Sequence, residues 1–214
     1  MIINFNQRKM IKKIEKIAKF LMVLALVGIL IVWMLPPEPA SSHTVTATVA
    51  AVVTCTTPLS TTAFPTIDNT AVFTSSPDAT TTVNSNTGVY MRVYDVGGPD
   101  ATGTPSLYKS TATTDNIGSA DSAYADTATL VAGTEGYGIQ ATTTGPNMAI
   151  APRFLQTGDA VGGLEAGSAY SVVLASSSAA VADEVVTIIH KAAVPATQTA
   201  GDYSDTITIT CTVN

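Results

Sequence analysis

The chain falls into two parts with different patterns of apolar and polar residues. In residues 20–35, sixteen apolar residues follow one another without interruption. Beyond residue 43, apolar residues alternate with polar ones, mostly threonine, in several short segments. An unbroken apolar run is typical of a helix that enters a membrane, whereas alternation separates the two faces of a β-strand. The pattern therefore predicts an N-terminal hydrophobic helix followed by an all-β body.

The alternation is clearest at the two ends of this body. In residues 44–55 the apolar side chains share one face, and threonines occupy most of the other. In residues 203–213 a threonine lies between each pair of the apolar residues Ile207, Ile209, Cys211 and Val213. Further strands are predicted in residues 89–94, 137–141, 170–174 and 185–190.

Turn-forming residues separate these segments, at 76–78, 97–100, 145–147, 162–163 and 200–202. No amphipathic helix is predicted between the strands. Many short strands with such punctuation favour an antiparallel Ig-like β-sandwich over residues 44–214. Residues 97–128 show the weakest pattern, and we expect a long loop or a decorated hairpin there.

The N-terminal part has the layout of a segment that directs export. Residues 1–19 hold six of the ten basic residues and are expected to stay in the cytoplasm. The apolar run, at residues 20–35, is intermediate in length between a signal-peptide core of about 7 to 15 residues and a spanning helix of about 17 to 25. Residues 36–43 form a proline-containing linker that ends in Ala40, Ser41, Ser42 and His43. Two outcomes remain open: cleavage after Ser42, or a retained transmembrane anchor in contact with the membrane.

Charge excludes one class of function. Only 12% of the residues are charged, and the body beyond Ser42 has four basic residues against fourteen acidic ones, a formal net charge of −10. Such a body has no basic cluster to neutralise phosphates. We therefore expect no nucleic-acid partner.

The two cysteines lie on the apolar faces of the first and last predicted strands. An exported protein reaches an oxidising compartment, so we expect a disulfide between Cys55 and Cys211. The alternative is a pair of buried thiols that behave as small apolar side chains. Together with His43 and His190 the cysteines show no zinc-ligand spacing.

Catalytic motifs are scarce. Ser106 and Lys109 match Ser-x-x-Lys but lack its companion motifs, and His190 is expected to cap or edge a strand. Asp115, Asp121 and Asp126 are candidate oxygen ligands for calcium, although their spacing matches no EF-hand loop and solvated carboxylates are the alternative. We expect a protein that is not an enzyme and holds no cofactor.

The C-terminal residues 194–213 resemble the closing hairpin of secreted bacterial sandwich proteins of the spore coat protein U-type and pilin-like families. The similar pattern is Pro195-Ala196, then Ala200-Gly201-Asp202-Tyr203-Ser204-Asp205-Thr206, then an alternating strand. This resemblance implies a β-sandwich exposed at the cell surface. It departs from the family in the cysteines, because those families place their disulfide near the first strands.

The sequence thus predicts an exported, non-enzymatic structural or adhesion protein of the cell surface, with like subunits or surface glycans as partners. One alternative is a secreted carbohydrate-binding module, although the chain has only seven tyrosines and its single tryptophan, Trp33, lies in the apolar run. Another is a pilus-like subunit that assembles by strand exchange. If Cys55 is bonded to Cys211 of the same chain, the end of the first strand is held in its own domain, and we expect a monomer.

Overall fold

The protein is described by a computed structural model that covers residues 5–34, 44–57, 61–96, 106–109, 112–121 and 126–214. Side chains are described in these ranges except at residues 5–7, 29–34, 112–114 and 170. The chain divides into two compact units, Met1–Thr48 and Val49–Asn214. The predicted linker 36–43, with its cleavage site, lies outside the described residues.

The first unit contains one helix, α1 (Phe5–Met34). Its side chains are exposed wherever they are described, from residue 8 to residue 28. The predicted apolar run continues past Gly28, beyond the described side chains. Within the described part of the chain, no helix has the length and apolar character needed to cross a membrane, which a retained anchor, one of the two outcomes left open by the sequence, would require.

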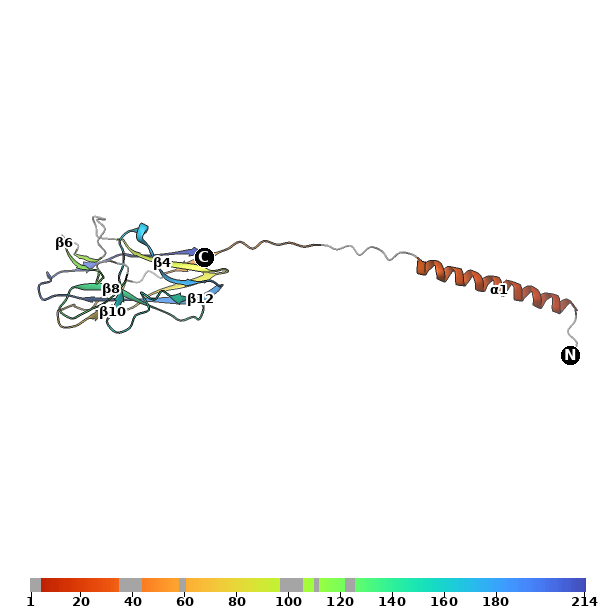
Figure 1. Ribbon diagram of the computed structural model, residues 1–214, viewed down its shortest axis with the longest axis horizontal. Helices are drawn as coiled ribbons and strands as arrows, with labels where there is room; N and C mark the ends of the chain where they lie inside the picture. The colour runs from red at the N-terminus through yellow and green to blue at the C-terminus, as the bar shows by residue number, and fades with distance from the viewer. Residues whose placement is uncertain (1–4, 35–43, 58–60, 97–105, 110–111, 122–125) are drawn as a thin grey trace. The chain divides into compact units, whose positions relative to one another are not determined.

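The second unit is built from antiparallel β-sheets, as predicted (Figure 1). The largest has seven strands; six of them form the order β1-β3-β12-β8-β10-β7, and β2 pairs with β12. Their bounds are β1 (Val53–Thr56), β2 (Phe73–Thr74), β3 (Ala79–Ser85), β7 (Thr127–Thr129), β8 (Gly136–Thr143), β10 (Ala160–Gly162) and β12 (Val181–Ala193).

A second sheet of four strands has the order β14-β4-β11-β9. Its bounds are β4 (Val89–Asp95), β9 (Ala149–Ile150), β11 (Val172–Ser177) and β14 (Ile207–Val213), and the 3-10 helix η1 (Ser168–Tyr170) precedes β11. A small third sheet has the order β13-β5-β6, with bounds β5 (Ser106–Lys109), β6 (Ala112–Gly118) and β13 (Tyr203–Ser204). The stretch 97–128, for which we expected a long loop or a decorated hairpin, therefore contains the hairpin β5–β6.

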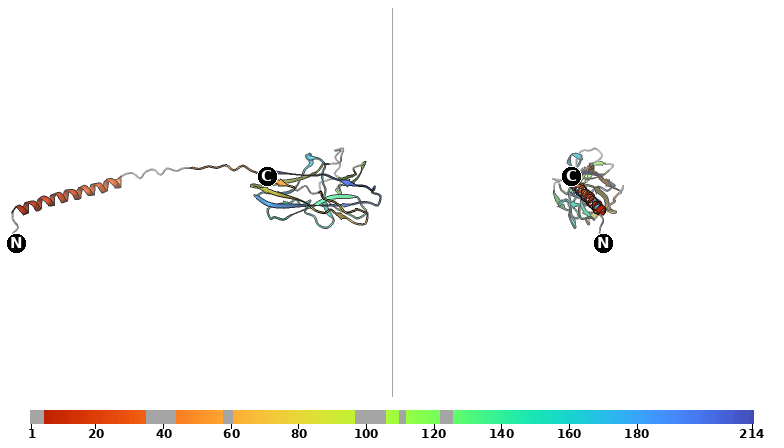
Figure 2. Two further views of the ribbon diagram at one scale, coloured as in Figure 1. Left: turned by 180° about the vertical axis from the view of Figure 1, so that it is seen from behind. Right: turned by 90° about the vertical axis from the view of Figure 1, so that its right-hand side faces the viewer.

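The core lies between the seven-stranded and four-stranded sheets, which form the two main layers of the body (Figure 1, Figure 2). Burial alternates along β4, so that Val89, Met91 and Val93 point inward and are fully buried. Ile139 of β8 and Ile188 of β12 belong to the same apolar cluster. Burying a side chain of this size contributes about 1.5 to 3 kcal/mol relative to leaving it exposed.

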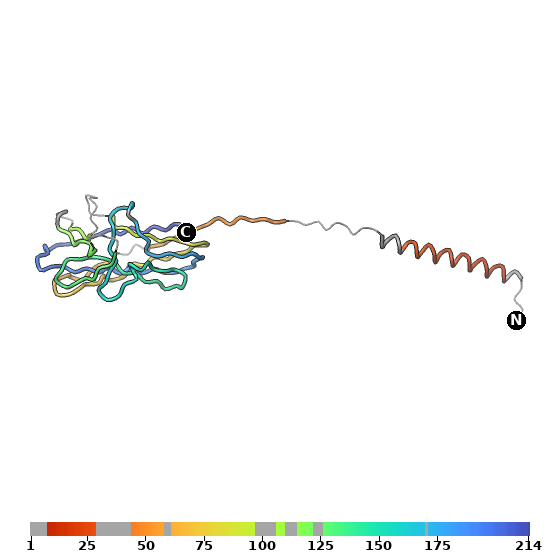
Figure 3. The backbone as a smooth tube through the Cα atoms, viewed as in Figure 1, coloured from red at the N-terminus to blue at the C-terminus, as the bar shows by residue number. Residues whose placement is uncertain are grey.

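The chain passes from one layer to the other between β3 and β4 (Figure 3). β3 belongs to the seven-stranded sheet and ends at Ser85, and β4 begins the four-stranded sheet at Val89. A Cβ atom at Gly88 would lie 2.7 Å from both the Asn214 Cβ and the Ser177 carbonyl oxygen. The close approach of these segments therefore requires glycine at position 88.

Two predicted strand boundaries are wrong, each for a tertiary reason. The predicted strand 44–55 forms β1 only from Val53, because its partner β3 ends at Ser85 and turns away. The predicted strand 203–213 is divided into β13 and β14, because Tyr203 and Ser204 pair with β5 while Ile207 onward pairs with β4. The remaining predicted strands lie within β4, β8, β11 and β12 apart from the first two residues of 170–174.

Candidate functional site

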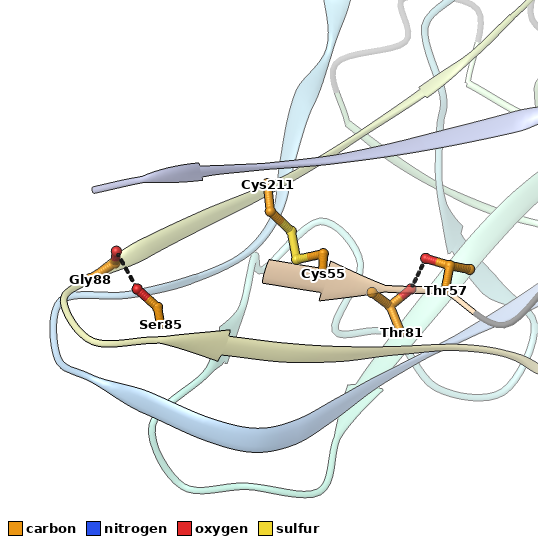
Figure 4. The surroundings of a disulfide bond; sticks show 6 residues. All are labelled: Cys55, Thr57, Thr81, Ser85, Gly88 and Cys211. Atoms are coloured by element: carbon orange, nitrogen blue, oxygen red, sulfur yellow. Dashed lines mark hydrogen bonds between the residues drawn. A yellow bond between two sulfur atoms is a disulfide. The ribbon is translucent and has the colours of Figure 1, made fainter. Parts of the chain in front are cut away.

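The first and last strands of the body are joined by a disulfide between Cys55 and Cys211 (Figure 4). Their Cα atoms are 6.2 Å apart, and 156 positions separate them in the sequence. Cys55 pairs with Val83 of β3, and Cys211 pairs with Met91 of β4. Since β1 and β14 are edge strands of different sheets, the bond ties the two layers together at this edge. The predicted disulfide is confirmed.

Hydroxyl hydrogen bonds surround the disulfide on the strands that flank it. The Thr57 and Thr81 hydroxyl oxygens are 2.9 Å apart, and the Ser85 hydroxyl donates to the Gly88 carbonyl oxygen at 3.2 Å (Figure 4). These bonds connect the end of β1 to β3 and brace the turn that leads into β4. The edge is therefore held by hydrogen bonds as well as by the covalent link.

The segment just before β1, residues 44–52, is exposed and has no regular secondary structure. Val45 and Val49 are 80% and 82% exposed. The Asn86 side chain holds the last residues of this segment, because its Oδ1 accepts from the Val52 N–H at 2.7 Å and its Nδ2 donates to the Ala50 carbonyl oxygen at 2.8 Å. Before Ala50, the alternating apolar residues form no strand within the described chain.

A second group of interest is a buried polar cluster formed by Asp95, Tyr137, His190 and Asp205. The Tyr137 hydroxyl lies 2.9 Å from His190 Nδ1 and donates to Asp205 Oδ2 at 3.2 Å. The Asp205 side chain is hydrogen-bonded to Asp95, whose Oδ2 accepts from the Ser106 N–H at 2.8 Å. The rings of Tyr137 and His190 are stacked. The cluster thus connects four parts of the body, namely β4, β8, β12 and the segment between β13 and β14.

Burial changes the ionisation of this cluster. Burial, followed by the charge of Asp95 and the hydrogen bond to it, raises the pKa of Asp205 to about 8. Burial lowers the pKa of His190 to about 4 and raises that of Tyr137 above its usual value. Near neutral pH the Asp205 carboxyl group is therefore largely protonated, beside a neutral His190 imidazole and a neutral Tyr137 phenol. Asp95 is fully buried, so the hydrogen bond between Asp205 and Asp95 connects β4 to the segment between β13 and β14 inside the fold.

Sequence patterns contained a signal for this cluster that the strand prediction did not use. Asp95 follows Val89, Met91 and Val93 at the next inward position of an alternating strand. A carboxyl group at an inward position needs a buried partner. The partner, Asp205, is 110 positions away in the sequence, so its identity depends on the fold. His190 lies inside β12 and is buried, and the expectation that it edges a strand is wrong.

The calcium candidates are not gathered into one site. Asp115 lies 3.5 Å from the Lys109 ammonium, and Asp121 accepts from the Asp126 N–H at 2.8 Å. Among the described residues, no group of three or more His, Cys, Asp and Glu side chains is arranged to hold a metal ion.

Ser106 and Lys109 both lie on β5, but their surroundings do not support Ser-x-x-Lys chemistry. Ser106 is fully buried. The ammonium group of Lys109 is paired with Asp115. The Lys109 side chain therefore forms an ion pair with Asp115.

Breaking the disulfide should destabilise the body. We expect Cys211→Ser to lower the free energy of unfolding by about 2 to 5 kcal/mol, because the bond closes a long loop in the unfolded chain. Urea unfolding measures the change, and Thr212→Ser on the next, exposed position serves as the matched control. Non-reducing mass spectrometry should find the peptides of Cys55 and Cys211 linked; free thiols at both positions of the exported protein would contradict the assignment.

From the pKa values in the buried cluster we predict that the free energy of unfolding falls as the pH rises from 6.5 to 8. The contribution of Asp205 is complete below about pH 4, the usual value of an unfolded Asp, and is lost as the pH rises toward 8. The contribution of His190 is complete above pH 6.5 and is lost as the pH falls toward 4, so the two oppose each other only below 6.5.

Thermal unfolding at pH 6.5 and 8.0 measures this fall. Asp205→Asn should remove the decrease, whereas Asp202→Asn, at an exposed position three residues earlier, should keep it. A melting temperature that rises from pH 6.5 to 8.0 in the unmodified protein would show that Asp205 does not titrate in this way.

Comparison of the chain with protein-family models, with curated proteins and with solved structures finds no match. The resemblance of residues 194–213 to spore coat protein U-type and pilin-like domains therefore stays a prediction. The function has to be inferred from the arrangement of the residues themselves.

Proposed function

We propose that the protein is exported and acts as a non-enzymatic structural or adhesion protein of the bacterial cell surface. The observation that carries this proposal is the disulfide between the first and last strands of the body. Such bonds form and persist outside the reducing cytoplasm. The basic segment followed by an apolar run at the N-terminus supports the same conclusion, because it has the layout of an export signal.

The finer fold that we propose is an Ig-like β-sandwich. Its support is the pair of antiparallel sheets with a common apolar core and edge strands joined by a disulfide. A body of this kind is a rigid module whose outer faces are free to contact other molecules. This suits adhesion or assembly at a surface.

A non-enzymatic role is supported by where the polar groups lie. The titratable cluster around Asp95 is enclosed by strands. A shallow hollow of about 300 Å³ lies beside β1, lined by Val52, Thr54, Asn84, Ser85, Asn86 and Val181. None of these side chains is an acid, a base or an activated nucleophile.

Export is tested with residues 1–43 fused to alkaline phosphatase, an enzyme that becomes active only where its disulfides form. We expect an active fusion, and we expect Leu26→Arg to abolish the activity, because a charge in the apolar run opposes membrane insertion. Leu26→Ile is the matched control and should stay active. An inactive wild-type fusion that accumulates in the cytoplasm would refute the proposal. If the segment is cleaved, N-terminal sequencing should show that the exported chain begins near His43.

A second candidate is a pilus-like subunit that assembles by strand exchange, and the exposure of residues 44–52 favours it. This segment alternates apolar and polar residues but forms no strand before Ala50 in the described chain. A segment of this kind can add to the open sheet edge of a neighbour. The disulfide keeps β1 in its own domain, so only the residues before β1 are available for donation.

Light scattering of the purified exported protein distinguishes the two candidates. The first candidate predicts a monomer, since the disulfide holds β1 in its own domain. The second predicts a ladder of multimers that resists SDS and is lost in Val49→Pro, because proline cannot donate a backbone hydrogen bond to a neighbouring strand. Val49→Thr retains strand propensity and is the control. A ladder that persists in Val49→Pro would exclude donation by this segment.

A further inference from the structure

The outward face of the four-stranded sheet has an ordered arrangement of side chains. Along its central strand β4, the outward residues are Tyr90, Arg92 and Tyr94, each partly exposed. We call these three residues the Tyr-Arg-Tyr row. The two tyrosines are four positions apart on one strand, which places them about 13 Å from each other along it.

Hydroxyl groups lie beside this row on β14. The register pairs Tyr94 with Thr208, Arg92 with Thr210 and Tyr90 with Thr212. On the other side, β11 places Val173 opposite Arg92 and Ser176 opposite Tyr90. The outward positions of this sheet therefore combine aromatic rings, hydroxyls and a guanidinium, and they include no carboxylate.

Arg92 differs from the other basic residues of the body. Lys109 lies 3.5 Å from Asp115 and Lys191 lies 3.4 Å from Asp159. The charges of Glu165, Asp121 and Asp126 act on Arg153.

Within the described residues, the Arg92 guanidinium donates through Nη1 to the Ser171 carbonyl oxygen at 3.1 Å and forms no ion pair. A guanidinium has five N–H donors, so the remaining donors are available for a ligand. Arg92 is thus a partly exposed cation that has no carboxylate partner among the described residues of a strongly acidic body.

We propose that the Tyr-Arg-Tyr row binds an acidic polysaccharide of the uronic acid type. Arg92 donates two parallel hydrogen bonds to a sugar carboxylate, a geometry in which guanidinium groups are preferred over ammonium groups. Tyr90 and Tyr94 offer ring faces to the C–H faces of neighbouring sugars, and Thr208, Thr210 and Thr212 hydrogen-bond sugar hydroxyls. This inference rests on the proposed adhesion function and names its ligand class.

The outward positions of β4 and β14 carry no acidic side chain next to Arg92. Charges separated by more than about 8 Å are largely screened at physiological salt. Locally, the row presents a positive group surrounded by neutral hydroxyls and aromatic rings. The contact between Arg92 and a sugar carboxylate is therefore the charge interaction that this proposal requires at the site.

The test uses the purified full chain in mild detergent, with polygalacturonate as the acidic probe and dextran as the neutral one. We expect binding to polygalacturonate and none to dextran, measured by biolayer interferometry at 0.15 M salt. Arg92→Gln should weaken the affinity by about tenfold, as expected for the loss of a charge-assisted hydrogen bond. The affinity of Arg92→Lys should lie between that of the unmodified protein and that of Arg92→Gln, because lysine keeps the charge but cannot donate two parallel hydrogen bonds. Tyr94→Ala should weaken the affinity without changing the preference for the acidic polymer.

Lys191→Gln is the matched control. It removes the same charge from β12 of the other sheet, and its affinity should stay within about twofold of the unmodified protein. An intact disulfide in non-reducing mass spectrometry shows that each variant is folded.

Equal binding to both polymers, no binding to polygalacturonate, or equal losses in Arg92→Gln and Lys191→Gln would each overturn the inference. The binding assay does not depend on export. An active alkaline phosphatase fusion without polysaccharide binding would therefore refute the ligand alone, and an inactive fusion would refute the proposed function.

Discussion

The body of this protein depends on the covalent bond between Cys55 and Cys211. β1 has only four residues, and within its sheet it pairs only with β3. A strand this short at an edge gains little from its own hydrogen bonds, yet the disulfide connects it to β14 and so to the other layer. Because the bond closes a loop that contains almost the whole body, it limits the freedom of the unfolded chain over most of its length.

The first strand of the body begins where its partner strand ends, close to the disulfide. The disulfide holds Cys55 next to β14, and β3 turns toward β4 three residues after the pairing of Val53 with Ser85. In the described chain, residues 44–52 therefore form no strand. Their apolar side chains are exposed because the sheet ends, although their sequence pattern is that of a strand.

β4 connects the interior of the protein to the surface that we propose as a binding site. Its inward residues Val89, Met91 and Val93 fill the core, and Asp95 continues the same face into the polar cluster. The outward residues of the same strand are the Tyr-Arg-Tyr row. A shift of the strand by one residue would exchange the two faces, so the packing of the core and the pairing of Cys211 with Met91 also fix the position of Arg92.

The sequence by itself determined the N-terminal helix, the antiparallel β body, the pairing of the two cysteines and parts of β1, β4, β8, β11, β12, β13 and β14, whereas it did not indicate β3. These features follow from local alternation and from the placement of both cysteines on apolar strand faces. Tertiary structure alone decided where the first strand begins, because that depends on the end of β3. It also decided that Asp95, Tyr137, His190 and Asp205 meet, and that Asp115 pairs with Lys109 while Asp121 lies beside Asp126. Side-chain periodicity specifies which face of a strand a residue occupies, whereas the neighbours it meets there come from strands distant in the sequence and are set by the sheet order.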